Sequence, residues 1–71
     1  MSVSGKVNMI RVGAANIKAW AEQILEAINE DFDGYDSLQT IEILNDRIIM
    51  EAKGNKNDIM EAYDELEEED I

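Results

Sequence analysis

The chain has 71 residues, a formal net charge of −11, and neither cysteine nor histidine. A chain this short has room for one domain with a thin hydrophobic core, and without cysteine that core has no disulfide or thiolate metal site to support it. The side chains best suited to proton transfer near neutral pH and to thiolate attack are also missing, so we expect a non-enzymatic protein without catalytic residues or a cofactor.

The first half of the chain predicts a strand followed by a helix. After a flexible start over residues 1–5, residues 6–13 (KVNMIRVG) are short, rich in Val and Ile, and end at glycine, which favours a β-strand. From Asn16 the apolar residues recur at a spacing of three and four, which is typical of an amphipathic helix. We expect Asn16 to cap this helix and Phe32 to lie near its end.

The second half predicts a β-hairpin and a second helix. Within residues 38–44 (LQTIEIL), Ile41 and Ile43 share one face of a strand and Thr40 and Glu42 the other. Residues 47–52 (RIIMEA) form a second β-branched, apolar run, and Asn45-Asp46 separates the two. Residues 53–57 form a polar turn. Asp58 and Glu61 then have the spacing of a capping box at the start of a helix, whose last residues, 67–71, we expect to fray as an acidic tail.

The predicted order is therefore β-α-β-β-α in a single α+β domain over residues 1–71, with two helices packed on one face of a three-stranded sheet. An unpaired apolar edge of this sheet would attract a second chain, so we expect a homodimer. The candidate core residues are Met9, Ile10, Val12, Trp20, Ile24, Ile28, Ile41, Ile43, Ile48, Met50, Tyr63 and Leu66.

Two stretches resemble the Alba family of archaeal chromatin and RNA-binding proteins. They are residues 10–13 (IRVG) and residues 48–54 (IIMEAKG), each followed by a predicted helix. The resemblance implies an Alba-like fold and nucleic-acid binding at the turn that contains Lys53 and Gly54. Glu51 departs from the family pattern, which has a basic residue there, and residues 29–47 look like an insertion with an extra strand.

A nucleic-acid site is the alternative function that this resemblance implies. Ammonium groups and free backbone N–H groups at a helix start attract phosphate, although the predicted cap residues Asp58 and Glu61 compete at the same end. A capped surface turn is the other interpretation. The candidate contact residues are Lys6, Arg11, Lys18, Lys53 and Lys56.

A weak metal site is the second candidate. Asn29, Asp31 and Asp33 occupy the first, third and fifth places of a calcium-loop pattern, and Gly34 occupies the sixth. Thr40 stands where the pattern needs a bidentate carboxylate. An ordinary acidic turn explains the same residues, and on that interpretation calcium has little effect on folding.

The acidity is concentrated near the end of the sequence, where residues 58–70 contain eight carboxylates and no cation. Such a stretch either solubilises a helix face or docks on a basic protein. The candidate protein-interaction residues are Glu61, Asp64, Glu65, Glu67 and Glu68.

We therefore expect a small acidic interaction module that docks on another macromolecule and self-associates. The alternatives are an Alba-like DNA- or RNA-binding protein and a polyanion that mimics nucleic acid on a basic protein. No apolar segment approaches the roughly 20 residues that span a membrane, so we expect no membrane partner and a cytoplasmic location.

Overall fold

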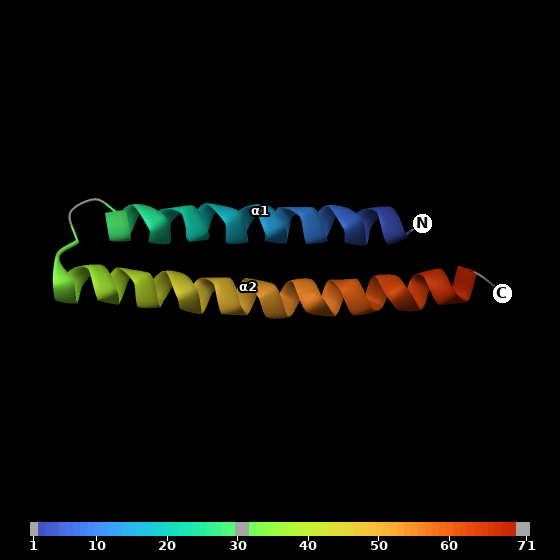
Figure 1. Cartoon of the computed structure of the whole chain (residues 1–71). Helices are drawn as coiled ribbons and strands as arrows, with labels where there is room; N and C mark the ends of the chain where they lie inside the picture. Colours follow the sequence, from blue (N-terminus) through green and yellow to red (C-terminus); the bar gives the residue numbers. More distant parts are fainter. Residues whose placement is uncertain (1, 30–31, 70–71) are drawn as a thin grey trace.

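The computed structural model describes residues 2–29 and 32–69, and within them the chain is an antiparallel pair of long helices. Helix α1 spans Ser2–Asn29 and helix α2 spans Gly34–Glu69, and they lie side by side with both termini at the same end (Figure 1). The molecule is a rod of 57 × 14 × 11 Å. Its radius of gyration of 16.4 Å exceeds the value of about 11 Å that a compact domain of this length would have.

The predicted α+β fold is therefore wrong, and the Alba-like architecture with its three-stranded sheet is wrong with it. The described residues contain no strand: residues 6–13 belong to α1, and residues 38–44 and 47–52 belong to α2. Residues 16–29 are helical as expected, but they form the second half of a longer helix. The sheet edge that was expected to hold a second chain does not exist in this part of the molecule.

The residues at the start of α2 suit a tight turn before the helix. Gly34 has a φ of +45°, a left-handed conformation that glycine adopts without steric cost. The backbone N–H of Asp33 donates to Ser37 Oγ at 2.8 Å, and the N–H of Asp36 donates to the Asp33 carbonyl at 3.2 Å. Asp36 also places a negative charge in the first turn of α2, where the helix dipole favours it.

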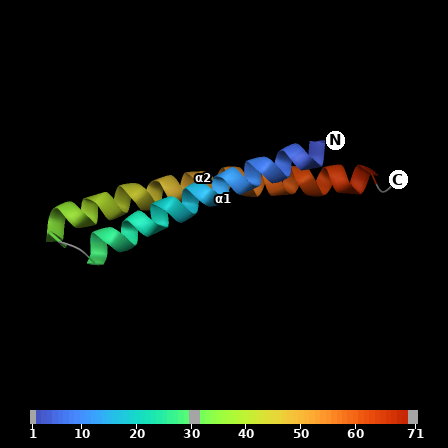
Figure 2. The same cartoon turned by 90° about the horizontal axis from the view of Figure 1, so that it is seen from above.

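The helices meet along a seam with a seven-residue repeat, and they cross at a shallow angle (Figure 2). On both helices the less exposed residues recur at alternating steps of three and four, the spacing of a coiled coil. In α1 the residues at this spacing are Lys6, Ile10, Gly13, Ile17, Trp20, Ile24 and Ala27; Ala21, next to Trp20, is also half-buried but lies outside the repeat. In α2 they are Ser37, Ile41, Leu44, Ile48, Glu51, Asn55, Asp58, Ala62 and Glu65. We call these residues the contact seam.

The contact seam changes character along the rod. Near the connection between the helices it is mostly apolar, and Leu44, 4% exposed, is the one buried hydrophobic side chain of the described residues. Nearer the termini, the seam contains charged and amide side chains. We call residues 17–29 and 34–48 the loop half of the hairpin, and residues 2–16 and 49–69 the terminal half.

Five of the predicted core residues lie on the contact seam: Ile10, Trp20, Ile24, Ile41 and Ile48. The other seven are exposed: Met9, Val12, Ile28, Ile43, Met50, Tyr63 and Leu66. The strand interpretation placed Ile41 and Ile43 on one face, because strand side chains repeat every two residues. In a helix, residues two apart point in nearly opposite directions.

Candidate interaction surface

Lys6 is the centre of an acidic cluster in the terminal half. Its ammonium group forms an ion pair with Asp58 at 3.8 Å and a hydrogen-bonded ion pair with Glu61. The hydrogen bond to Glu61 is the main reason why the pKa of Lys6 is raised above 10.5, and the charges of Glu61, Asp58 and Glu65 add to it. Asp58 and Glu61 therefore hold the two helices together instead of capping a helix start.

We expect this cluster to make stability depend on pH in the alkaline range. Because the pKa of Lys6 is raised on folding, its contribution is complete below pH 10.5 and is lost as pH rises through the folded-state pKa. Lys6→Met should therefore destabilise the hairpin at neutral pH, and the difference from wild type should vanish at strongly alkaline pH. Urea unfolding followed by circular dichroism at both pH values measures this difference.

Lys53→Met is the matched control, because Lys53 is an exposed residue of α2 for which the structure shows no ion pair within the described range. Equal destabilisation by Lys6→Met and Lys53→Met at neutral pH would contradict the role given to Lys6.

Asn55 makes a second polar contact between the helices, and Gly13 makes room for it. The Asn55 side-chain amide donates to the backbone carbonyl of Ile10 at 3.3 Å. A Cβ atom at Gly13 would lie 2.8 Å from Cγ of Asn55, so glycine makes room for the amide. This contact fixes the register, because it places residue 10 of α1 level with residue 55 of α2.

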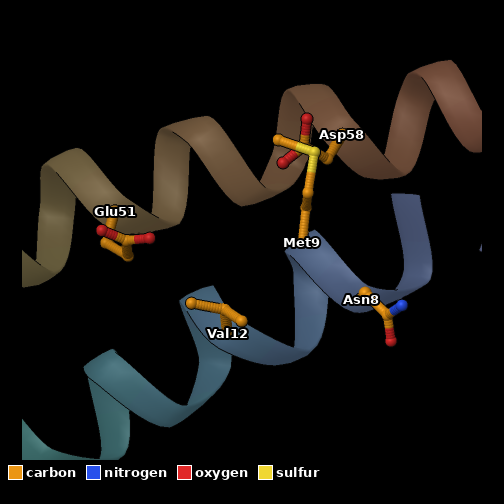
Figure 3. Close-up of a pocket in the computed structure, with 5 residues that line it drawn as sticks. All are labelled: Asn8, Met9, Val12, Glu51 and Asp58. Atoms are coloured by element: carbon orange, nitrogen blue, oxygen red, sulfur yellow. The ribbon is translucent and has the colours of Figure 1, made fainter. Parts of the chain in front are cut away.

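An open groove of about 330 Å³ lies beside this contact (Figure 3). Asn8, Met9 and Val12 of α1 line it together with Glu51 and Asp58 of α2, and the Met9 side chain extends toward Asp58. Its carboxylates belong to the seam, and nowhere in the described ranges do three His, Cys, Asp or Glu side chains form a group that could hold a metal ion. The groove is therefore shallow and open to solvent, and two carboxylates line it.

A second repeat of seven residues runs along α2 beside the contact seam. It contains six large apolar residues that are 40–76% exposed: Tyr35, Leu38, Ile49, Ile59, Tyr63 and Leu66. Glu42, Asn45, Ala52 and Lys56 fill the remaining places of this repeat. The spacing is again three and four, so these residues form one continuous face of the helix.

Helix α1 has an equivalent face with exposed Val7, Leu25 and Ile28, with Ala14 and Ala21 between them. Antiparallel helices are related by an approximate two-fold axis perpendicular to the plane that contains them. Equivalent positions of the two heptad repeats therefore lie on the same side of that plane. We call the combined α1 and α2 faces the second stripe. It holds nine of the fifteen large hydrophobic side chains that are exposed among the described residues.

The second stripe is poor in acid. Only Glu42 among the chain's 17 acidic side chains occupies one of its described positions, whereas Arg11, Lys18 and Lys56 supply three of the six basic ones. Elsewhere carboxylates predominate. The stripe is thus a largely apolar surface that carries three cations and one carboxylate on a strongly negative molecule.

The predicted nucleic-acid residues are brought together only in part. Arg11, Lys18 and Lys56 share the second stripe and Lys6 is paired with acids. Lys53 borders the stripe, four residues after Ile49 and three before Lys56. Helix α2 is continuous through residues 53–57, so no helix N-terminus supplies free backbone N–H groups there.

The other predicted site residues are spread over the terminal half and the connection. Glu61 bonds Lys6, Glu65 lies on the seam with its Oε1 buried and without a hydrogen-bond partner among the described residues, and Asp64 and Glu67 are exposed. The Glu68 side chain and Asp31 lie outside the described residues. Asn29 ends α1 and Asp33 precedes α2, so the calcium site stays a prediction.

Comparisons with protein-family models, with curated proteins and with solved structures found no match to this chain. In the described part of the chain, neither helix is long and apolar enough to cross a membrane. The second stripe was not predicted from the sequence, although its apolar residues recur with a seven-residue period that the sequence contains.

Proposed function

We propose that this chain is a non-enzymatic interaction module whose helical hairpin packs its second stripe against another helical protein surface. One observation supports this function above the others: fifteen large hydrophobic side chains are exposed among the described residues, whereas one is buried. Large contiguous apolar patches on a water-soluble surface mark interaction sites, because burying them in a partner removes them from water.

The test is whether the apolar surface is available on the isolated chain. At low micromolar concentration we expect the uncharged dye Nile red to bind, because it detects exposed apolar surface without being repelled by the negative protein. We also expect the melting temperature to rise when a binding surface covers the stripe. No dye binding, together with a melting curve that never changes with protein concentration or added proteins, would refute the proposal.

A second candidate function is docking on a basic protein through the terminal half of α2. The supporting observation is that Asp64 and Glu67 remain exposed beside the Lys6 cluster. A lysine-rich peptide should bind in a salt-sensitive way, and Asp64→Asn with Glu67→Gln should weaken it. Glu22→Gln with Glu26→Gln in α1 is the matched control, since it removes the same charge from the loop half.

We expect no binding to generic DNA or RNA at physiological salt. Each phosphate contact needs a cation, and a net charge of −11 opposes the approach of a polyanion. Fluorescence anisotropy with labelled duplex and single strands measures this directly. Salt-sensitive binding that is lost in Lys53→Glu with Lys56→Glu would favour the nucleic-acid alternative.

A further inference from the structure

We propose that the second stripe is the interface of a homodimer, in which two hairpins pack face to face with their loop ends at opposite ends of a four-helix bundle. This inference rests on the proposed function and adds the partner, a second copy of the chain, and its orientation. It follows from the size of the stripe, its charge, and the placement of Glu42 and Lys56.

The size of the face fits a stable dimer. The stripe runs along most of a rod that is 57 Å long and 14 Å wide. Such a face offers about 800 Å² per copy, which is the area that each partner contributes to a standard protein interface. Small residues at Ala14, Ala21 and Ala52 lie between the large apolar side chains, so helices of two copies can interlock there.

The charge distribution selects a second copy as the occupant. A chain of net charge −11 repels itself on every acidic surface, but the described part of the stripe carries one carboxylate and three cations. Two copies can therefore meet on this face with their carboxylates turned outward. The loop-end residue Glu42 is then the one acid that must find a cation in the interface.

The position of that acid selects the orientation. Glu42 lies in the loop half, whereas Lys56 lies seven residues beyond Ile49 in the terminal half. Consider a two-fold axis that lies between the two hairpins, perpendicular to the helices and level with Ile49. This axis places Glu42 of each copy beside Lys56 of the other. The same axis sends the acidic ends of α2 to opposite ends of the bundle. They are then separated by far more than the screening length of about 8 Å at physiological salt.

Sedimentation equilibrium of three proteins tests the interface. Wild type should be a dimer at tens of micromolar, with salt strengthening the association. Ile49→Glu should weaken the dimer by about a hundredfold or more, because it buries an unpaired carboxylate twice in one symmetric interface. Met50→Glu is the matched control: Met50 is the next residue, is 74% exposed and lies off the stripe, so this variant should remain a dimer.

Charge exchange tests the orientation and does not depend on Ile49→Glu remaining folded. Lys56→Glu should weaken the dimer by roughly tenfold, more than Arg47→Glu, which changes the net charge equally at an exposed residue on the other side of α2. Adding Glu42→Lys to Lys56→Glu should restore association, because it re-forms the pair with reversed signs. A parallel arrangement predicts no such recovery, so failure of the double variant overturns the proposed orientation.

A monomeric wild type at millimolar concentration and high salt would overturn the homodimer. If that monomer still bound Nile red, the interaction module would stand and its partner would be a different protein. If Met50→Glu dissociated the dimer while Ile49→Glu did not, the second stripe would be excluded as the interface. Circular dichroism of each variant separates a folded monomer from an unfolded chain.

Discussion

Leu44→Ala should lower the free energy of unfolding by about 2–4 kcal/mol, the usual cost of removing a buried leucine side chain. Leu44 is 4% exposed and lies in the apolar loop half, beside the α1 part of the seam that contains Ile24. A chain of this length has a total stability of only about 4–10 kcal/mol. One substitution therefore removes a large share of the folding free energy.

Ile43→Ala is the control for this experiment. Ile43 precedes Leu44, is 54% exposed and lies on neither the contact seam nor the second stripe. Its truncation should cost less than about 1 kcal/mol, because little apolar area is lost from a buried site. Urea unfolding of both variants at equal protein concentration makes the comparison. Similar losses would show that Leu44 is not the centre of the packing.

Gly13→Leu should destabilise the hairpin by about 1–3 kcal/mol through overpacking. Leucine is a better helix former than glycine by most of the roughly 1 kcal/mol that separates glycine from alanine, so a net loss must come from the interface. Asn55 can rotate away from a single methyl group, but it cannot clear the volume of a leucine side chain. The hydrogen bond from Asn55 to the Ile10 carbonyl would be lost as well.

Gly54→Leu is the matched control, because a Cβ atom at this residue of α2 has no neighbour within 4 Å. It should leave stability unchanged or raise it. Asn55→Ala in the Gly13→Leu background should recover part of the loss by making room for leucine. Thermal melts of the three variants measure these effects, and a more stable Gly13→Leu protein would contradict the close contact of Gly13 with Asn55.

The sequence predicts the seam residues of the loop half better than those of the terminal half. Trp20 and Ile24 recur at helical spacing, and their seam positions are as expected. Ile41 and Ile48 were also predicted to be core residues, but as parts of strands and not of a helix. Ile41, Ile43 and the β-branched run at 47–52 match a strand over a few residues, whereas the helix is visible only over two or three heptads.

Turn-forming residues inside α2 account for the rest of the error. Asn45 lies within the helix and its side-chain amide donates to the Ile41 carbonyl at 2.9 Å, one turn earlier. Gly54 and its polar neighbours also lie in the helix interior, where their low propensity is overridden by packing against α1. Since Glu51, Asn55 and Asp58 occupy seam positions, hydrophobicity alone does not reveal the repeat. The role of Asn55 depends on Gly13 and that of Asp58 on Lys6, each more than forty residues away in sequence.

The change from apolar to polar contacts along the seam has a consequence for folding kinetics. Residues nearest the connection are close in sequence, so they meet at little cost in loop-closure entropy, and they also bury the most apolar surface. The hairpin should therefore zip from the connection toward the termini and open in the reverse order. Amide hydrogens around Leu44 should exchange with solvent slowest, and those around Lys6 and Glu65 should exchange through local opening long before the whole chain unfolds.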